Sequence, residues 1–167
     1  GKEAIKLSKA EQPDIILMDV MMPEIDGIEA TQKIKQDPAT SHIPIIMITA
    51  LNAQEDKVNG LNAGADDFLT KPINERALMT RLKSLIRLKQ MNDELRVRDQ
   101  TGQGLGVGQS IESINKIEGS KVLVIDDDVV QLKKIQEKLT ESGIESTSCE
   151  HPEEAEEITG FEPGTVH

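Results

Sequence analysis

Five polar residues stand directly after apolar runs of the sequence: Asp19, Thr49, Lys71, Asp126 and Asp127. Three carboxylates placed together would repel one another unless a cation joined them, and an all-oxygen site with water is what Mg²⁺ prefers. A lysine ammonium beside them would neutralise phosphoryl oxygens, and a hydroxyl would donate a hydrogen bond to one of them. These residue types therefore indicate a magnesium site that can hold an acyl phosphate, provided that the fold brings the five residues together.

The runs before these residues have the composition of buried strands. We expect strands at 15–18, 43–48, 67–70 and 122–125, with an edge strand at 144–150. Runs of Ile, Leu, Val and Met without polar alternation suit parallel strands that are covered on both faces. The carboxyl ends of such strands lie along one edge of the sheet, where ligands bind. The five polar residues would therefore meet at that edge.

Helical periodicity fills the intervals between the strands. Helices are predicted at 2–10, 28–37, 53–63, 74–99 and 129–139, and the segment 152–158 starts another. Strands that alternate with helices in this way indicate βαβ units in a right-handed parallel sheet. The expected fold class is α/β.

The composition restricts the partners and the location. A net charge of -11 argues against direct binding of nucleic acid or of an anionic membrane, because either would need a basic face. The single Cys149 excludes an internal disulfide framework and is compatible with a reducing compartment. The sequence shows no membrane span and no signal peptide, and we expect a cytoplasmic protein. The chain begins with Gly1 rather than Met, and we expect a fragment.

Each of the five polar residues also has a simpler explanation when it is taken alone. An acidic run after a strand is most often a solvated loop or a helix N-cap, which would account for Asp126 to Asp128. Asp19 and Thr49 would cap turns, and Lys71 would be an ordinary surface lysine. Their common position at strand ends favours one shared site.

Four motifs together resemble the receiver domain of two-component response regulators: VLVIDDD, IILMDVMMPEIDG, IIMITA and GADDFLTKP. The resemblance implies a flavodoxin-like (CheY-like) doubly wound parallel sheet with strand order 2-1-3-4-5. It also implies that Asp19 is the phosphoacceptor. Asp126 and Asp127, together with Asp19 and the backbone carbonyl of Met21, would hold Mg²⁺.

The same resemblance implies further roles around the phosphoacceptor. Thr49 would be the switch hydroxyl, Phe68 the rotating aromatic residue, and Lys71 the phosphate-contacting lysine, joined to Pro72 by a cis bond. The implied donor is a phosphohistidine of a histidine kinase or phosphotransfer protein. Phosphorylation would change the surface around the 53–63 helix, the third strand and the last helix. Such a module is not itself an enzyme.

More narrowly, the long helix ending in DELRVRD, the glycine-rich stretch and the later IDDD resemble regulators of the PleD type. These carry two receivers in tandem before a GGDEF diguanylate cyclase domain. The chain contains no GGDEF segment, so any cyclase activity would belong to a parent protein.

The order of the motifs differs from that of an intact receiver, which begins with its acidic-pair strand. We expect residues 1–99 to be a first receiver without its opening strand, first helix and second strand, and 121–158 to open a second receiver. Residues 100–120 are predicted to be a flexible linker, because their alternate glycines miss the dinucleotide-binding spacing. The tail 159–167 carries no pattern.

The two incomplete parts are complementary. We expect them to form one sheet, either within the chain as a circular permutant or between chains by domain swapping. The segments 1–10 and 152–158 would then compete for one helix position, which 1–10 should win because Ile5 is apolar where Glu156 is not. The chain after about residue 150 should be loose.

Two other functions remain open. The chain could be a structural receiver without phosphorylation that dimerises through the 74–99 helix, whose leucines suit a helix pair. It could also be an aspartate-nucleophile phosphatase, but such enzymes carry a D-x-D pattern, and Asp19 is followed by Val20 and Met21.

Overall fold

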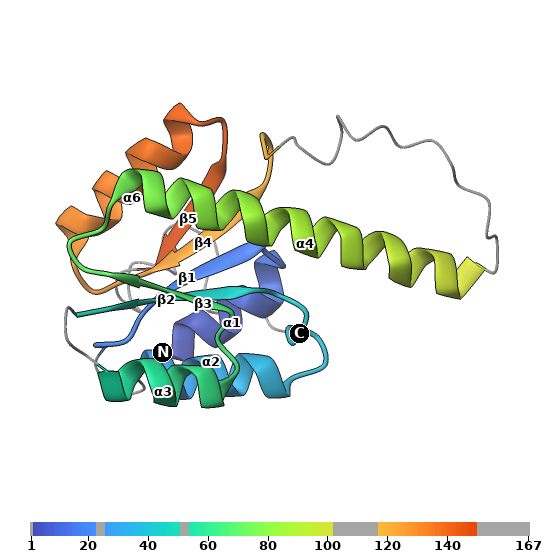
Figure 1. The fold of residues 1–167 in the computed structure, drawn as a ribbon, viewed down its shortest axis with the longest axis horizontal. Coiled ribbons are helices and arrows are strands. Elements are labelled where there is room, and N and C mark those ends of the chain that lie inside the picture. The colour runs from blue at the N-terminus through green and yellow to red at the C-terminus, as the bar shows by residue number, and fades with distance from the viewer. Residues whose placement is uncertain (1, 23–25, 51–53, 102–116, 150–167) are drawn as a thin grey trace, which may run out of the picture.

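A computed structural model describes residues 2–22, 26–50, 54–101 and 117–149. These residues form a five-stranded parallel sheet with helices on both faces (Figure 1). The strands are β1 (Ile15–Asp19), β2 (Ile45–Thr49), β3 (Asp67–Thr70), β4 (Lys121–Ile125) and β5 (Glu145–Cys149). The helices are α1 (Lys2–Glu11), α2 (Gly27–Gln36), α3 (Gln54–Ala63), α4 (Glu75–Thr101) and α6 (Val129–Glu141). The predicted α/β class is confirmed.

The strand order is β3-β2-β1-β4-β5. When β4 is counted as the first strand and β5 as the second, this is the order 2-1-3-4-5 of the flavodoxin-like fold. The sheet therefore has the expected architecture with its chain order permuted. Closure occurs within the single chain, because β4 from the second part pairs with β1 from the first.

Contacts at the start of β1 and β4 hold the two parts in register. Ile15 pairs with Val122, and Leu17 pairs with Val124. The Asp14 N–H donates to the Lys121 carbonyl at 2.8 Å, and the Lys121 N–H donates to the Asp14 carboxylate at 2.8 Å. Since the strands are parallel, this register brings their carboxyl ends to the same height, where Asp19 and Asp126 stand.

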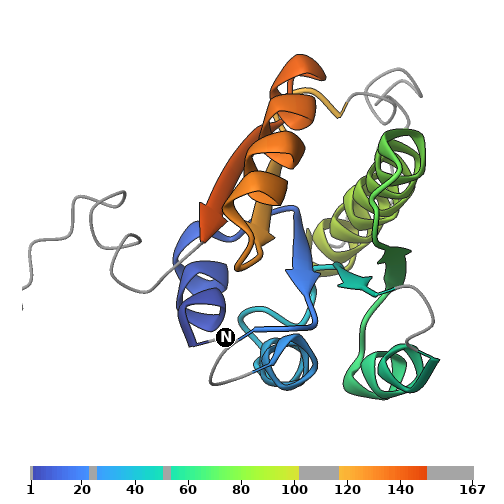
Figure 2. The ribbon, with the colours of Figure 1, turned by 90° about the vertical axis from the view of Figure 1, so that its left-hand side faces the viewer.

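Helices α4 and α6 cover one face of the sheet, and α1, α2 and α3 cover the other (Figure 2). The two faces of β1 illustrate this division. Ile15 and Leu17 pack with α4 and α6, whereas Ile16 and Met18 pack on the opposite side, as the alternation of side chains along a strand requires. The core is aliphatic on both faces.

Helix α1 occupies the contested helix position. Its residues Ala4 and Leu7 are buried in the same cluster as Ala30 and Ile34 of α2. The competing segment 152–158 and the tail 159–167 lie outside the described residues, and so does most of the linker.

Most element boundaries differ from the predicted ones by one or two residues, and two of these differences have a local cause in the hydrogen bonds. Strand β2 starts at Ile45 rather than Ile43, because the Ile43 N–H bonds to the Thr40 carbonyl in a turn and Pro44 has no N–H. Helix α6 runs on to Glu141 and is closed by Ser142, whose backbone N–H bonds to carbonyls of the last turn.

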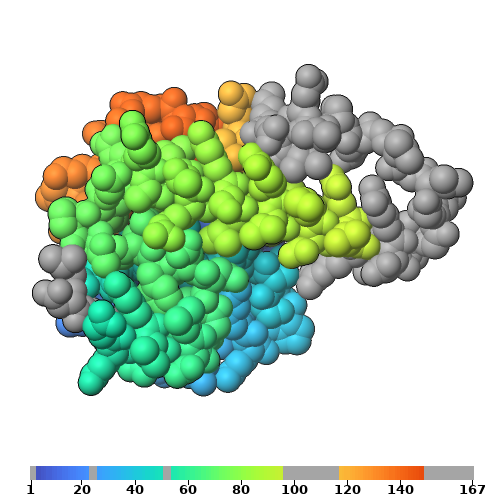
Figure 3. Space-filling model, viewed as in Figure 1, coloured from blue at the N-terminus to red at the C-terminus, as the bar shows by residue number. Residues whose placement is uncertain are grey.

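Helix α4 has 27 residues and lies across the face of the molecule that Figure 3 shows, and Figure 1 shows its far end projecting from the body. Leu78, Leu82 and Ile86 in its first half are buried against the sheet. Leu88 and Leu95 in its second half are more than half exposed. None of the described helices has the length and apolar character that a membrane span requires.

Candidate functional site

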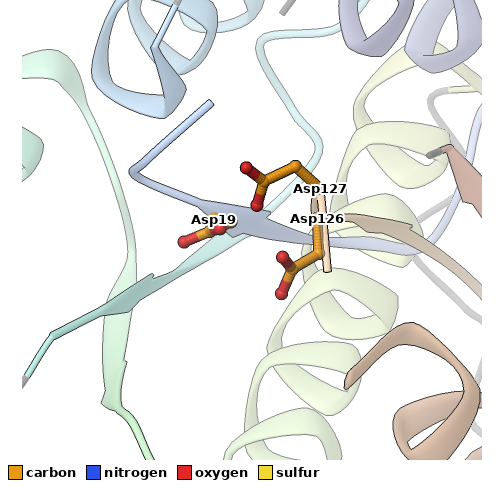
Figure 4. A group of neighbouring side chains, drawn as sticks. All are labelled: Asp19, Asp126 and Asp127. Carbon is orange, nitrogen blue, oxygen red and sulfur yellow. The ribbon is translucent and has the colours of Figure 1, made fainter. Parts of the chain in front are cut away.

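Three carboxylates meet where β1 and β4 end. Asp19 is the last residue of β1, and Asp126 and Asp127 directly follow β4. Each can offer one oxygen such that the three oxygens lie within 4.8 Å of one another (Figure 4). Asp19 and Asp126 are each 1% exposed, and Asp127 is exposed. The three acids therefore cluster at one edge of the sheet, as predicted.

The Asp19 carboxylate has different surroundings at its two oxygens. Oδ1 lies 3.2 Å from the ammonium of Lys71 and accepts a long hydrogen bond of 3.4 Å from the Met21 N–H. Oδ2 is buried and has no hydrogen-bond partner among the described residues. A buried carboxylate oxygen without a donor is costly, because it loses water and gains nothing in return. This oxygen fits a role as ligand to a cation or as attacking atom.

Both oxygens of Asp126 are occupied by the start of α6. Oδ1 accepts from the Asp128 N–H at 2.9 Å, and Oδ2 accepts from the Gln131 side-chain amide at 2.7 Å. Asp128 itself caps α6, since its carboxylate accepts from the N–H groups of Val130 and Gln131. Gln131 is not among the predicted site residues, because the sequence carries no signal for the rotamer that brings its amide to Asp126.

The electrostatics of the site favour a cation. Burial, followed by the negative charge of Asp126, raises the pKa of Asp19 to about 7, and the ammonium of Lys71 opposes this rise. Burial also raises the pKa of Asp126. Burial lowers the pKa of Lys71, but the charges of Asp19 and Asp126 outweigh it and raise this pKa overall. One lysine does not neutralise three acids, so these oxygens fit Mg²⁺.

Thr49 stands beside the acids at the end of β2, the neighbour of β1. It is buried, and its hydroxyl has no hydrogen-bond partner among the described residues. Its carbonyl accepts a bond of 2.8 Å from the Lys71 N–H, which ties the ends of β2 and β3 together. The Lys71–Pro72 peptide bond is cis. Thr49 and Lys71 thus stand at the same sheet edge as Asp19.

Phe68 lies on β3, below this edge, and is half-buried against the core that α1, α2 and α3 cover. A Cβ added to Gly60 of α3 would come within 2.9 Å of the Phe68 ring and 2.8 Å of the Met47 sulfur. The absence of a side chain at Gly60 therefore lets α3 approach the ring. Phe68 also lines a cavity of about 320 Å³ between β3 and α4.

Gly27 holds the loop after Asp19 close to the sheet. Its N–H donates to the Val20 carbonyl at 2.9 Å, and an added Cβ would lie 2.1 Å from the Asp19 carbonyl oxygen. Only glycine fits where the start of α2 approaches the end of β1 so closely. The dipeptide Asp26-Gly27 indicates a turn in the sequence, but it does not indicate this contact.

The backbone of Met21 reaches the site through its N–H, while its side chain is exposed. Ligation of a metal by its carbonyl stays a prediction. The five residues selected from the sequence thus lie together at the carboxyl edge of the sheet, and Phe68 lies beneath them.

Comparisons with known proteins identify the family of the chain. The family model for the response regulator receiver domain matches residues 1–83. This range includes Asp19, Thr49 and Lys71 and leaves out the acidic pair. The chain is 42% identical over 139 residues to the response regulator PleD of Caulobacter vibrioides, covering 83% of this chain and 31% of PleD. The chain thus spans about a third of the length of that relative.

A smaller relative is covered more fully. Protein PilH of Pseudomonas aeruginosa is 38% identical over 86 residues, which are 52% of this chain and 71% of PilH. Among solved structures, a signal receiver domain from Vibrio parahaemolyticus aligns with a TM-score of 0.51 and 28% identity, covering 56% of this chain and 71% of that one. Sequence and fold agree, and the chain belongs to the response regulator receiver family.

Proposed function

We propose that the chain is a phosphoacceptor module in which Asp19 takes a phosphoryl group from a histidine kinase or phosphotransfer protein. One observation carries the proposal: the buried carboxylate of Asp19 contacts Lys71 and clusters with two acids from the other end of the chain. Asp19, Asp126 and Asp127 would hold Mg²⁺, with the Met21 carbonyl as a further ligand.

The proposed reaction is an in-line displacement. An oxygen of Asp19 attacks the phosphorus of a phosphohistidine, the P–O bond forms, the P–N bond breaks, and the electron pair returns to the imidazole. Bound Mg²⁺ would neutralise charge on the phosphoryl oxygens. Lys71, already 3.2 Å from Asp19, would pair with a phosphoryl oxygen. The hydroxyl of Thr49 would donate to another, which would give this buried group a partner.

The proposed readout follows from Thr49 and Phe68. Movement of the Thr49 hydroxyl towards the phosphoryl group would open space above Met47 and Phe68, which pair across β2 and β3. Phe68 would turn into that space. The cavity beside Phe68, lined also by Lys57 and Arg81, would change shape and present a different surface at α3, β3 and α4.

A second groove offers a docking place for the phosphoryl donor. It lies between α4 and α6, has a volume of about 380 Å³ and is lined by Pro72 and Gln131 next to the acids. Val130 at its rim is 62% exposed. Its lining mixes apolar residues with the charged Glu75, Lys134 and Glu137, and such a mixed groove between two helices suits a helical donor protein.

The domain organisation is proposed as follows. Residues 1–99 belong to a first receiver, and 121–158 open a second. In a longer parent protein, further segments would complete each of the two receivers. In this chain they complete each other. The parent would carry an output domain, which by similarity to PleD we propose to be a diguanylate cyclase. Receiver domains are generally not enzymes. We propose that the phosphotransfer takes place in the cytoplasm.

A structural receiver that dimerises without phosphorylation is the second candidate. The exposed Leu88, Met91 and Leu95 follow one another at spacings of three and four on α4, which suits a helix pair. Exchange of the 117–149 part between two chains would give a dimer of another kind.

Labelling with acetyl phosphate and Mg²⁺ tests these alternatives. Covalent labelling of the wild type that Asp19→Asn abolishes supports the phosphoacceptor. Absence of labelling in a folded wild type supports the structural receiver. Rapid hydrolysis of unrelated phosphate esters would instead indicate a phosphatase. The control is Ser41→Ala, because Ser41 is exposed in the turn before β2, at the end of the sheet opposite to the site, and this variant should label like the wild type.

A further inference from the structure

Gln131 makes the one side-chain contact to Asp126 that comes from α6 among the described hydrogen bonds. Its amide nitrogen donates to Asp126 Oδ2 at 2.7 Å, and the contact is partly buried. Its own N–H is bonded to the cap Asp128. The side chain of Gln131 therefore joins the first turn of α6 to an acid of the site, while its backbone N–H bonds to the helix cap.

The chemistry of this contact is suited to holding a metal ligand. Asp126 is 1% exposed and lies near the equally buried Asp19, so it cannot rely on water to fix its carboxylate. An amide donor orients the carboxylate without adding a positive charge that would compete with a cation. Lys71, by contrast, contacts Asp19 with a full charge. The two acids are thus supported in different ways.

Loss of the amide would leave one of two arrangements. Asp126 Oδ2 could stay where it is as a buried acceptor without a donor, or the carboxylate could rotate about its χ2 angle to find another partner. The Asp128 N–H holds only Oδ1, so it does not prevent that rotation. In both arrangements the Asp126 carboxylate is no longer held in one orientation for binding a cation.

We propose that Gln131 is a positioning residue that fixes the Asp126 carboxylate for Mg²⁺ and thereby sets the affinity of the site. This inference rests on the proposed function. A contribution of about tenfold to metal affinity is typical for such supporting hydrogen bonds. In this proposal Gln131 acts through Asp126 and is not itself a ligand of the metal.

The test uses the full chain and titrates Mg²⁺ by calorimetry, because the sequence has no Trp or Tyr for fluorescence. Gln131→Met keeps the length of the side chain and removes the donor. Gln131→Asn keeps the donor with a shorter reach. Gln136→Met is the matched control, because Gln136 is also half-buried on α6 and its side chain makes no bond to the site among the described hydrogen bonds.

We expect Gln131→Met to raise the dissociation constant for Mg²⁺ about tenfold, Gln131→Asn to raise it by less, and Gln136→Met to leave it within about twofold. With acetyl phosphate, the Mg²⁺ concentration for half-maximal labelling should rise by the same factor in Gln131→Met. The labelling rate at saturating Mg²⁺ should stay within about threefold, a separation that a merely misfolded variant would not show.

Equal Mg²⁺ affinities of wild type and Gln131→Met would overturn the inference while leaving the proposed function standing. If Gln131→Met fails to fold by circular dichroism, Gln131→Leu, which also lacks the donor, decides in the same way. A folded wild type that binds no Mg²⁺ would overturn the proposed function itself, and the inference with it.

Discussion

The backbone of Lys121 is held from both sides by Asp14: its carbonyl accepts from the Asp14 N–H and its N–H donates to the Asp14 carboxylate, each at 2.8 Å. The same carboxylate lies 3.4 Å from the ammonium of Lys89 on α4. Asp14 therefore links α4, β1 and β4 at the end of the sheet opposite to the site. This contact sets the register that brings Asp126 beside Asp19.

We predict that Asp14→Ala lowers the free energy of unfolding by about 1 to 2 kcal/mol, because it leaves the Lys121 N–H without its acceptor. Urea unfolding followed by circular dichroism measures this. Lys121→Ala is the matched control, since only the backbone of this exposed residue is used, and it should change stability by less than about 0.5 kcal/mol. Equal effects of the two substitutions would mean that Asp14 does not join the two parts.

The pH dependence of the metal-free protein follows from Asp19, whose pKa is raised from 3.8 to about 7. Between these values the folded protein binds more protons than the unfolded chain, so this group makes stability fall as pH rises through the interval. Below pH 3.8 its contribution is constant. Asp19→Asn should remove the effect and stabilise the metal-free chain at about pH 7.5 by about 1 to 3 kcal/mol.

Urea unfolding in EDTA at about pH 5 and about pH 7.5 measures this difference for the wild type and for Asp19→Asn. The gain from the substitution should be larger at the higher pH. A wild type that is more stable than Asp19→Asn at the higher pH without metal would contradict the account, because it would show that the acids do not repel one another.

Gly27→Ala should damage the site through a steric clash. The added Cβ would lie 2.1 Å from the Asp19 carbonyl oxygen, so the start of α2 or the end of β1 must move. We expect a loss of about 2 to 4 kcal/mol in the free energy of unfolding. Gly119→Ala is a useful comparison, because its methyl group would meet open space at φ +82 and should cost only about 1 to 2 kcal/mol of backbone strain. Both values come from urea unfolding, and an equal or smaller loss for Gly27→Ala would argue against the close approach.

Closure within the chain predicts the result of mixing two inactive variants. Asp19→Asn lacks the acceptor, and Asp126→Asn lacks a metal acid. If the two parts pair only within a chain, unfolding and refolding the variants together restores no labelling by acetyl phosphate. Reciprocal exchange would rebuild one intact site in each mixed dimer, because one chain supplies Asp19 and the other Asp126. Restored labelling would therefore show exchange in place of closure.

The meeting of Asp19 with Asp126 could be predicted from the sequence because parallel strands end at one edge, wherever their segments stand in the chain. The positions of Thr49 and Lys71 follow from the same rule. The Gln131 contact could not be predicted, since it depends on which rotamer a side chain adopts in the first turn of α6. The requirement for glycine at position 27 could not be predicted either. It arises from the close approach of α2 to the end of β1, and not from a turn type. The apolar pattern predicts a strand that includes Ile43, but this residue is buried in the turn that precedes the strand.

The most direct measurement of the central claim is the affinity for Mg²⁺ of the wild type, Asp126→Asn and Asp128→Asn by calorimetry. Each substitution removes one negative charge from the same acidic triplet. Asp126 belongs to the carboxylate cluster, whereas Asp128 caps α6, and Asn can also cap. We predict one Mg²⁺ per chain, a loss of affinity of about tenfold or more in Asp126→Asn, and affinity within about threefold of wild type in Asp128→Asn. Unchanged affinity in Asp126→Asn would contradict the claim that the second part of the chain completes the site of Asp19.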